Sequence, residues 1–335
     1  MSRLDFSRFF LPIAPQLQGV EAELQRVLGS DVPVVEKLGA HVRAGQGKRL
    51  RPALVLLSAR FCAGGSAPPA DLDVRFGAIF EMIHTATLVH DDVIDHARLR
   101  RGRPTLNALW GNTLTVLFGD LLYIHAMSSA IQGRNWRLME ILAEVTTRMI
   151  EGELIQNDVL YRLDTSRKDY FDIQERKTAL LFGGCTESGA VMSGLGPEAC
   201  GAMRTFGLEV GRAFQLVDDL LDYTATSDQL GKPAFSDLRE GKLTLPMLTL
   251  LEKASGEAVP LVERVWSNGE EHPVEPEVEA ALRGLLAGHG ALAETRELAA
   301  RASTAARRAI ESLDGDPVTK SLLLEIPNAL LSRSQ

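Results

Sequence analysis

Apolar residues recur three and four positions apart along almost the whole chain. A clear example near the N-terminus is the series Leu17, Val20, Leu24 and Leu28. Spacing of this kind places apolar side chains on one face of an α-helix. Alternating runs of β-branched residues, which would indicate strands, are nearly absent. The pattern therefore predicts an all-α protein.

Clusters of glycine and proline divide this helical pattern into segments. Both residues interrupt helices, because glycine is conformationally free and proline lacks a backbone N–H. None of the breaks is long enough or biased enough in composition to be a linker, so we predict one domain over residues 1–335. The breaks fall at Gly64-Gly65 with Pro68-Pro69, and in the ranges 194–197, 231–233 and 266–276.

Two segments, residues 76–95 and 206–223, are apolar on nearly every side. A helix of that kind is buried in the protein interior. Neither is long enough and free enough of charge to span a membrane, and we find no other apolar run near the ~18–20 residues that a span needs. The two segments are therefore predicted to be central helices.

Each of the two buried segments ends in the same acidic pattern, D-D-x-x-D. The first copy begins at Asp91 and ends at Asp95, and the second begins at Asp218 and ends at Asp222. Residues four apart lie on one face of a helix, so the first and last aspartates of each copy are neighbours. The repetition of this pattern at the end of two buried helices predicts that the two copies share a role.

Neighbouring carboxylates of this kind need a cation. Their repulsion costs roughly 0.2–0.5 kcal/mol on an exposed helix, and beside buried apolar side chains the cost rises to several kcal/mol per ion. A divalent ion that takes only oxygen ligands, with room for water and phosphate, is typically Mg²⁺. A solvated acidic helix end explains one copy of the pattern but explains two copies poorly. We therefore predict that both copies bind Mg²⁺.

Two basic segments could supply the cations that a phosphate ligand needs. In the first, Lys48 and Arg51 precede a helical pattern that starts at residue 53, and Pro52 suits the first turn of a helix. Backbone amides and the helix dipole favour phosphate at such a start. The segment is not a P-loop, because no Ser or Thr follows Lys48 directly. The alternative is an ordinary solvated loop.

The second basic segment, residues 98–105, follows soon after Asp95 and contains Arg100 and Arg101. A bound diphosphate beside an acidic metal site requires such a basic run. The alternative is simple charge balance at the end of an acidic helix.

Further polar residues share the faces of the acidic motifs. His84 lies two turns before Asp91, and Gln215 lies one turn before Asp218. A histidine on a buried helix is more often a core residue, but on this face we favour contact with a ligand. The sequence alone leaves open the roles of four isolated polar positions: Lys177, Thr178, Lys232 and Lys242.

Composition narrows the classes of function. The 335-residue chain is 45% hydrophobic and 24% charged, as is ordinary for a globular protein, and its net charge is −8. An acidic chain without a basic block is a poor candidate for binding nucleic acid. The three cysteines lack metal or disulfide spacing, which favours a reducing cytoplasm. Residues 1–15 do not read as a signal peptide; we expect them to dock on the protein, with contact to a membrane as the alternative.

With these residues assembled, the chain resembles the trans-isoprenyl diphosphate synthases, and most closely their long-chain polyprenyl branch. The resemblance covers nearly the whole chain, and two D-D-x-x-D motifs in this company and order are highly specific. Phe235 is a departure, because many relatives have a small residue there, and it bears on the shape of the closing loop. The matching segments are 47–52, 81–95, 99–105, 151–153, 177–179, 214–223, 231–233 and 241–246.

The resemblance implies a bundle of mostly antiparallel helices around a deep central cavity, usually in a homodimer. It also implies Mg²⁺-dependent, head-to-tail joining of isopentenyl diphosphate to an allylic diphosphate, with three ions bound beside the substrates. The product would be a linear all-trans polyprenyl diphosphate, a precursor of a quinone side chain. Release of so apolar a product implies contact with a membrane surface.

The resemblance also assigns roles to individual residues. Mg²⁺ would be bound by Asp91 and Asp95 on one wall of the cavity, and by Asp218 and Asp222 on the other. The reaction would depend most on the first three of these, together with Arg100 and Lys177. Contacts of the allylic diphosphate would be Arg100, Lys177, Thr178, Gln215, Lys232 and Lys242. The isopentenyl diphosphate pocket would consist of Lys48, Arg51, His84 and Arg101.

Residues just before the first acidic motif bear on product length. Helix periodicity places Thr87 one turn below Asp91, whereas the resemblance points to Ala86, because short-chain synthases often carry an aromatic residue five positions before the first aspartate. Below it, Met82 and Ile83 are not aromatic either. An open tunnel predicts a heptaprenyl to decaprenyl product. The alternative is that Ala86 is small only to let two helices pack closely.

Other functions explain these residues less completely. A class I terpene cyclase shares the fold and the first motif, but it typically carries an Asn/Ser/Glu motif in place of the second and has no isopentenyl pocket. A non-catalytic synthase subunit lacks the aspartate motifs. A helical metal- or lipid-binding protein leaves the basic residues unexplained. A short-chain farnesyl or geranylgeranyl diphosphate synthase remains the nearest alternative.

Overall fold

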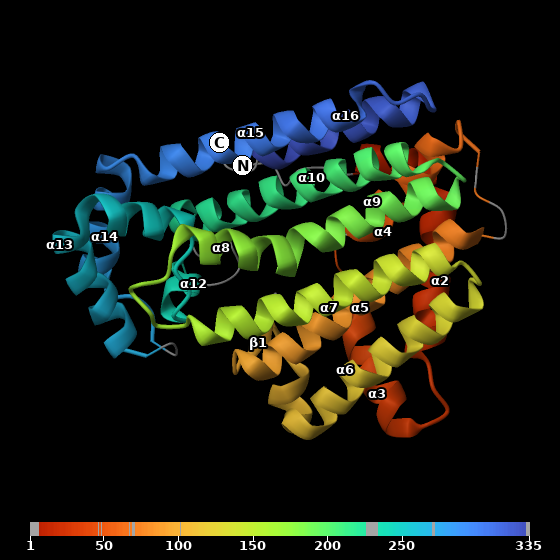
Figure 1. Cartoon of the computed structure of the whole chain (residues 1–335). Coiled ribbons are helices and arrows are strands. Elements are labelled where there is room, and N and C mark those ends of the chain that lie inside the picture. The colour runs from red at the N-terminus through yellow and green to blue at the C-terminus, as the bar shows by residue number, and fades with distance from the viewer. Residues whose placement is uncertain are drawn as a thin grey trace. The chain divides into compact units, whose positions relative to one another are not determined.

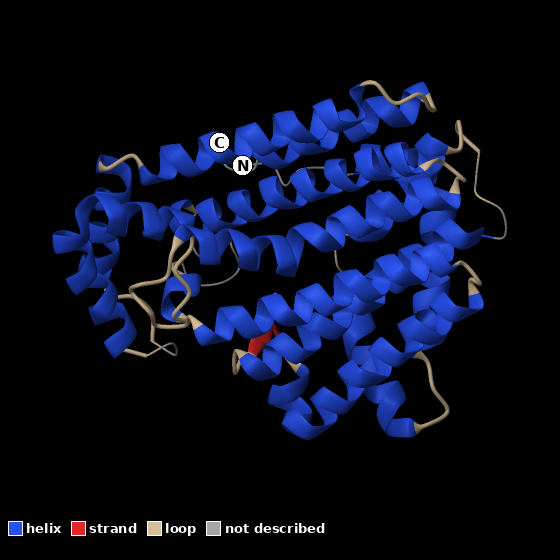
Figure 2. Cartoon of the chain, viewed as in Figure 1, coloured by secondary structure: helices blue, strands red, loops and turns tan. Residues whose placement is uncertain are grey.

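The structure is a computed structural model of the chain, and it describes residues 7–45, 47, 49–66, 68, 71–100, 102–225, 234–269 and 272–332. Helices dominate these residues (Figure 2). The one sheet among them is a two-stranded antiparallel hairpin, β1 (Leu99–Arg100) and β2 (Arg103–Pro104). The prediction of an all-α fold is confirmed.

The chain forms two compact units, each assembled from several stretches of sequence. Unit 1 comprises Met1–Thr146, Phe182–Gly207 and Ala309–Leu324, and unit 2 comprises Thr147–Leu181, Leu208–Arg308 and Glu325–Gln335. The boundaries fall inside helices and not at the glycine and proline breaks. The single domain that we predicted over residues 1–335 stays a prediction.

Unit 1 is built around helix α5 (Leu72–Ile94), which packs against α2, α4 and α6 (Figure 1). Phe76, Ile79 and Phe80 on this helix are fully buried, as the apolar pattern predicted. The other helices described in unit 1 are α1 (Ser7–Phe10), η1 (Leu11–Ile13), α2 (Ala14–Leu28), α3 (Pro33–Ala44), α4 (Leu50–Cys62), α6 (Leu106–Gln132), and parts of α7 (Trp136–Asp158), α9 (Leu180–Met192), α10 (Pro197–Thr224), α15 (Ala291–Glu311) and α16 (Pro317–Leu331).

Helix α5 is followed, directly after its C-cap Asp95, by a left-handed residue, His96, whose φ is 49°. The amide of Ala97 donates to the carbonyl of Asp92 at 3.0 Å, and the amide of His96 donates to the carbonyl of Val93 at 3.3 Å, the bonding pattern of a Schellman ending. The first acidic motif therefore lies on the last turn of the helix. Carboxylates at this negative end of the helix dipole are destabilised unless a cation is near.

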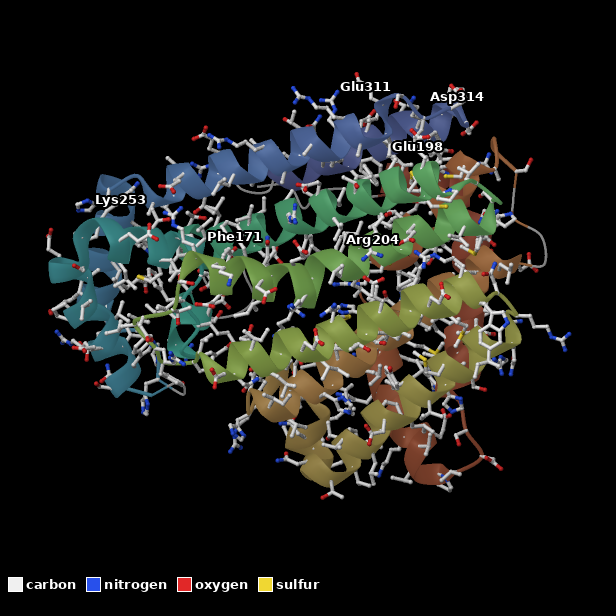
Figure 3. The ribbon with its side chains drawn as sticks, in the orientation of Figure 1. Phe171, Glu198, Arg204, Lys253, Glu311 and Asp314 are labelled. Carbon is white, nitrogen blue, oxygen red and sulfur yellow. The ribbon has the colours of Figure 1, made fainter. Side chains whose placement is uncertain are left out.

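A buried carboxylate joins three helices of unit 1. Glu187 on α9 accepts hydrogen bonds from Arg137 Nη2 at 2.6 Å, on α7, and from Arg204 Nη1 at 3.0 Å, on α10. Arg204, labelled in Figure 3, also pairs with Glu144 at 2.6 Å. Two guanidinium groups offset the cost of burying one carboxylate, so this cluster fixes α7, α9 and α10 relative to one another within the unit.

Helix α6 corrects one prediction. By length and composition it is apolar enough to cross a membrane, and 39% of its most apolar stretch is buried in the protein. The sequence search for an unbroken apolar run missed it, because polar residues such as Asp120 interrupt a segment that is apolar on average. Several of its large apolar side chains are exposed, among them Leu117, Ile124 and Ile131.

Unit 2 contains a second hydrophobic core, formed by helices that surround the C-terminal part of α10. Leu216, Val217 and Tyr223 of α10 are buried in this core. The other elements described there are the end of α7, α8 (Arg167–Gln174), the π-helical turn η3 (Glu175–Ala179), α12 (Ser236–Arg239), α13 (Leu245–Ser267), α14 (Pro276–Gly288) and parts of α15 and α16.

Phe235, the departure from the family pattern, is an anchor of the core of unit 2. Its backbone is left-handed, with φ 58°, a conformation that costs roughly 1–2 kcal/mol for a residue with a side chain. Its fully buried ring lies edge-on to Tyr223 at 5.0 Å, under the guanidinium of Arg283 at 5.2 Å. Burying such a ring contributes about 1.5–3 kcal/mol, which offsets the strain.

Candidate active site

The first acidic motif, in unit 1, presents two aspartates on its more exposed side. Asp91 and Asp95 are partly exposed, whereas Asp92 is buried. Asp92 Oδ1 accepts a hydrogen bond from Arg100 Nε at 2.7 Å. Burial raises the pKa of Asp92 and the nearby Arg100 opposes that rise. Asp91 and Asp95 thus keep the exposure that metal ligands need.

The second acidic motif, in unit 2, is buried more deeply. Asp218 is partly exposed, but Asp222 is 1% exposed. Asp222 Oδ1 accepts from the amide and the hydroxyl of Ser236, at 3.2 and 2.7 Å, and Oδ2 accepts from the amide of Asp237 at 3.2 Å. The carboxylate therefore binds the start of α12, where the helix dipole favours a negative charge. Its predicted role as a metal ligand stays a prediction.

Asp219, the middle aspartate of the second motif, lies against neutral donors. Its Oδ2 accepts from the Tyr170 hydroxyl at 2.5 Å, and its Oδ1 accepts from Gln215 Nε2 at 2.9 Å. Burial, followed by the nearby charge of Asp237, raises the pKa of Asp219 to about 8. Sequence reasoning overlooked Asp219 and Asp92. Each of these two aspartates lies one turn after an apolar residue of the buried stripe, and that position in the sequence could have indicated that they are buried.

The predicted contacts Lys177 and Thr178 lie on the π-helical turn η3, an element often found at functional sites. Lys177 forms an ion pair with Glu153 on α7, and Thr178 Oγ1 donates to Gln215 Oε1 at 3.0 Å. A Cβ at Gly152 would lie 2.9 Å from Cγ of Lys177. Glycine is therefore needed at that position, which accounts for the motif at residues 151–153.

Lys242 is held by the loop that follows α12. The Tyr161 amide donates to the carbonyl of Gly241 at 2.9 Å, and the Lys242 amide donates to the carbonyl of Asp237 at 2.8 Å. Gly241 has φ 78°, a left-handed conformation that favours glycine. The ammonium of Lys242 pairs with Glu240 at 2.7 Å. The loop thus fixes the backbone of Lys242 while its side chain keeps a local counter-ion.

A cavity of about 230 Å³ in unit 2 brings most of the predicted allylic contacts together. Asp219 and Tyr170 also line it. Arg100 belongs to unit 1 instead, and Lys232 lies outside the described residues. The predicted contacts on this cavity are Lys177, Thr178, Gln215 and Lys242.

A cavity of about 380 Å³ in unit 1 holds part of the predicted isopentenyl diphosphate pocket. His84 and Arg100 line it, and the aspartate that shares it with them is Asp92. The predicted residues Lys48 and Arg101 lie outside the described part of the chain. The cavity therefore combines basic side chains with one buried carboxylate of the first motif.

Arg51 lies near the start of α4, as predicted, but inside its first turn, because the helix begins at Leu50 and not at residue 53; it is not among the residues that line the cavity. Its guanidinium lies over the Phe182 ring at 5.2 Å, a cation–π contact. The neighbouring Arg49, which sequence reasoning passed over, donates to Glu81 at 2.8 Å and to Glu21 at 2.5 Å. Arg49 thus ties the start of α4 to α5 and α2.

Comparison with known proteins decides the family. The polyprenyl synthetase family matches residues 32–282. The chain belongs to this family. It is 34% identical to the octaprenyl diphosphate synthase of Escherichia coli strain K12, over 92% of this chain and 94% of that protein. A polyprenyl synthetase is a prenyltransferase, so the chain is one as well, and isopentenyl and allylic diphosphates are the substrates that the family uses.

Solved structures agree with this assignment. A polyprenyl synthase from Caulobacter crescentus CB15, complexed with calcium and isoprenyl diphosphate, has a TM-score of 0.90 and 34% identity, over 99% of this chain and 98% of the other. A decaprenyl diphosphate synthase from Rhodobacter capsulatus has a TM-score of 0.89 and 35% identity, over 99% of this chain and 100% of the other. Prenyl diphosphate synthases generally depend on a metal ion.

The acidic motifs of this polyprenyl synthetase fit a metal ion that takes only some of its ligands from the protein. No group of three or more His, Cys, Asp or Glu side chains is arranged to hold a metal within the residues that the structure describes. One or two carboxylates per ion, with water and substrate phosphates completing the shell, is the usual environment of Mg²⁺ in such enzymes. The donor set therefore fits Mg²⁺ bound together with a diphosphate.

Three cations of the synthase that we assign to diphosphate binding are paired with carboxylates in this structure. Arg100 pairs with Asp92, Lys177 with Glu153, and Lys242 with Glu240. A diphosphate must compete with these carboxylates or share the cations with them. The pairs hold the three cations in place in this structure.

The predicted chain-length residues of the synthase are mostly buried. Ala86, which is 2% exposed, belongs to an apolar cluster with Phe118 and Leu122 of α6, and Met82 and Ile83 are each 1% exposed. Thr87 is partly exposed, and its hydroxyl donates to the carbonyl of His84 at 2.9 Å. The cluster around Ala86 shares its residues Leu28, Val89 and Leu106 with the lining of the cavity in unit 1.

Proposed function

We propose that this polyprenyl synthetase condenses isopentenyl diphosphate with an allylic diphosphate, head to tail, and makes a long-chain all-trans polyprenyl diphosphate. The observation that carries the proposal is the pair of D-D-x-x-D motifs, each with a partly exposed first aspartate, Asp91 and Asp218. Relatives that match over nearly the whole chain are named octaprenyl and decaprenyl diphosphate synthases.

The allylic diphosphate binds at the cavity of unit 2 in this proposal. Lys177 and Lys242 would meet its negative charge, Gln215 would donate a hydrogen bond to one of its oxygens, and Thr178 would contact it beside Gln215. Isopentenyl diphosphate would bind to His84 and Arg51 in unit 1, together with Lys48 and Arg101. Charged donors of two kinds suit a diphosphate, since arginine binds it in a fork and lysine as a point charge.

The reaction follows from how these groups stabilise charge. The allylic C–O bond breaks, and its electron pair leaves with the diphosphate, whose charge Lys177 and Lys242 stabilise. The double bond of isopentenyl diphosphate then attacks the allylic cation and forms the new C–C bond. The departed diphosphate accepts the proton that is lost from the adduct. The lengthened diphosphate serves as the next allylic substrate.

We assign Asp91, Asp95 and Asp218 as ligands of Mg²⁺, with Asp222 as a further candidate and three ions present when both substrates are bound. When bound, the metal would add electrostatic stabilisation to the leaving diphosphate. Asp91 and Asp95 lie one turn apart at the end of α5, and both are partly exposed. Removal of the metal should abolish turnover.

We propose a product in the heptaprenyl to decaprenyl range. Ala86 is small at the position where an aromatic ring would block a growing chain, and its apolar cluster shares Leu28, Val89 and Leu106 with the lining of the cavity of unit 1. The names of the relatives point to the same range. Use of the product as a quinone side chain is part of the same proposal.

We further propose that the enzyme is a homodimer that uses the exposed stripe of α6. Leu117, Ile124 and Ile131 recur seven residues apart and are 58%, 62% and 63% exposed. Apolar side chains at this spacing lie on one face of a helix and favour packing against another helix. Sedimentation equilibrium tests this: Leu117→Glu together with Ile124→Glu should give a monomer, and an unchanged mass would contradict it.

A cytoplasmic location, with brief membrane contact for release of the product, completes the proposal. The cysteines Cys62, Cys185 and Cys200 are free thiols, which suits a reducing compartment. Leu11 near the N-terminus is 74% exposed and could touch a membrane surface. Fractionation of cells that express the protein, with a vesicle-binding assay, tests both points.

One assay tests the central proposal. Purified protein is incubated with labelled isopentenyl diphosphate, an allylic primer and Mg²⁺, and the products are separated by thin-layer chromatography. We expect long polyprenyl chains, and no product when Mg²⁺ is chelated. Cyclic hydrocarbons would indicate a terpene cyclase, short chains would indicate a short-chain synthase, and activity only after addition of a second protein would indicate a subunit.

A further inference from the structure

A chain of hydrogen bonds in unit 2 connects Tyr170 to Thr178. The Tyr170 hydroxyl, on α8, donates to Asp219 at 2.5 Å, and Asp219 accepts from Gln215 Nε2 at 2.9 Å. Gln215 in turn accepts from the Thr178 hydroxyl, on η3, at 3.0 Å. Two of these residues, Thr178 and Gln215, are assigned to the allylic diphosphate. The other two are buried, with exposures of 7% for Tyr170 and 1% for Asp219.

The chain of bonds fixes which way the Gln215 amide points. Gln215 Nε2 lies against Asp219 Oδ1 and Gln215 Oε1 lies against the Thr178 hydroxyl, so the amide turns its NH₂ group toward Asp219 and its oxygen toward Thr178. The reversed amide would place its oxygen against the carboxylate oxygen. An NH₂ group has two hydrogens, and only one is used on Asp219. The second can be donated to an oxygen of a diphosphate in the cavity.

The fold holds Tyr170 in place independently of any ligand. Helix α8 begins with a capping box between Ser166 and Asp169. Arg167 on its first turn pairs with Glu252 at 2.9 Å and with Glu294 at 2.6 Å. Because these contacts lie beside Tyr170 in the same short helix, they determine where its hydroxyl lies.

Asp219 needs the Tyr170 hydroxyl, because a buried carboxyl that lacks donors is costly. Burial raises the pKa of Tyr170 well above its ordinary value, so the hydroxyl keeps its proton and remains a donor. Without it, Asp219 could turn toward other donors, and that turn would release the amide of Gln215.

We propose that Tyr170 is a positioning residue for the allylic substrate: it acts through Asp219 to hold Gln215 and Thr178 in the orientation that receives the diphosphate. The inference rests on the proposed function, because it takes that diphosphate as the ligand of the cavity. Tyr223 is the comparison within the same core. Its hydroxyl accepts from the Thr244 hydroxyl at 3.0 Å, so it is a buried tyrosine with a different partner.

The first test is Tyr170→Phe, which removes one oxygen and no carbon. We expect KM for the allylic primer to rise roughly tenfold, the effect of losing one buried hydrogen bond, while KM for isopentenyl diphosphate changes less than about twofold. Tyr223→Phe is the matched control. It should lower the melting temperature to a similar extent and leave the ratio of the two KM values unchanged.

The second test asks whether the effect travels along the chain of bonds. Tyr170→Phe is measured again in a Thr178→Val background, with Thr178→Val alone as the reference. Independent sites would multiply their effects on KM. If the chain connects them, Tyr170→Phe should raise the allylic KM of Thr178→Val less than about threefold, because the orientation it protects is already lost.

The outcomes separate the inference from the proposed function. A wild-type protein that makes no prenyl product contradicts the proposed function itself. An active wild type in which Tyr170→Phe shifts both KM values equally, or changes only the melting temperature, overturns the inference. If Tyr170→Phe does not fold, Asp219→Asn replaces it, since an amide cannot accept on both atoms. An unchanged allylic KM in folded Asp219→Asn would also overturn the inference.

Discussion

The two acidic motifs have the same pattern of aspartates but different surroundings. In unit 1 the middle aspartate, Asp92, pairs with a cation, Arg100, whereas in unit 2 Asp219 is bound by the neutral donors Tyr170 and Gln215. Burial raises the pKa of both aspartates. The charge of Arg100 opposes that rise at Asp92, whereas the nearby charge of Asp237 adds to it at Asp219 and brings its pKa to about 8. The neighbours, and not the motif, therefore set how far the pKa of each aspartate is raised.

The last aspartates differ as well, because the two helices end at different places. Helix α5 stops at Ile94, so Asp95 is its C-cap and remains partly exposed. Helix α10 continues to Thr224, so Asp222 stays within the helix, buried, and caps α12. The last aspartate of the motif is therefore partly exposed in the first copy, whereas in the second copy it binds the start of α12.

The largest expected effect concerns the first aspartates, where the two motifs are alike. Asp91→Ala and Asp218→Ala should each reduce turnover by several orders of magnitude, because each removes a proposed metal ligand. The melting temperature should hold or rise, since repulsion between neighbouring carboxylates is relieved. Turnover with Mg²⁺ and thermal melting measure the two effects. A variant that kept more than about a tenth of wild-type turnover, a loss under roughly 1.4 kcal/mol, would not have lost a catalytic group.

The next effect concerns the last aspartates, where the motifs differ. Asp222→Ala removes the acceptor for two amides and a hydroxyl, and should lower the free energy of unfolding by about 2–4 kcal/mol. Asp95→Ala should change it by less than about 0.5 kcal/mol, as is usual for a partly exposed site. Denaturant unfolding checks both values. Should Asp222→Ala keep full stability and still lose turnover as Asp218→Ala does, then Asp222 is a metal ligand and the contrast between the motifs fails.

A smaller effect should separate the substrates of the two units. Arg51→Ala in unit 1 should raise KM for isopentenyl diphosphate roughly ten- to hundredfold, the loss of one charge-assisted contact of ~1.5–3 kcal/mol. Lys177→Ala in unit 2 should act on the allylic primer instead. Steady-state kinetics with each substrate varied in turn measures both. If Arg51→Ala raised the KM values of both substrates equally, the assignment of separate pockets would be wrong.

The parts of the site that are local in sequence could be predicted, and those that depend on distant partners could not. Helix periodicity places Asp91 with Asp95 without any knowledge of the fold. The partner of Asp219 is Tyr170, on another helix 49 residues away, and no spacing rule connects the two. The π-helical turn that carries Lys177 also has no signal in the apolar pattern.

The same distinction holds for the fold: features that depend on local spacing could be predicted, and those that depend on distant partners could not. The apolar stripes predicted the buried central helices, because burial of one stripe needs only its own spacing. The averaged apolar character of α6 escaped a search for unbroken runs. The left-handed Phe235 could not be predicted from propensity, since its strain is offset by Tyr223 and Arg283, which only the fold brings near.

The smallest expected effect in energy concerns the region just before the first motif, and it tests whether unit 1 sets the product length. Ala86→Phe places a ring in the apolar cluster with Phe118 and Leu122. Because Ala86 is 2% exposed, the ring has to displace its neighbours, and overpacking should cost ~1–3 kcal/mol of stability. If the cluster borders the path of the growing chain, products should also shorten, to about three or four isoprene units, as in the short-chain synthases that often carry an aromatic residue at this position. Product chromatography beside a melting curve distinguishes the two effects.

Ala86→Leu, which adds bulk without a ring, is the matched control and should give an intermediate length. A well-folded Ala86→Phe enzyme with the wild-type product distribution would mean that Ala86 serves helix packing alone, and that the tunnel runs elsewhere.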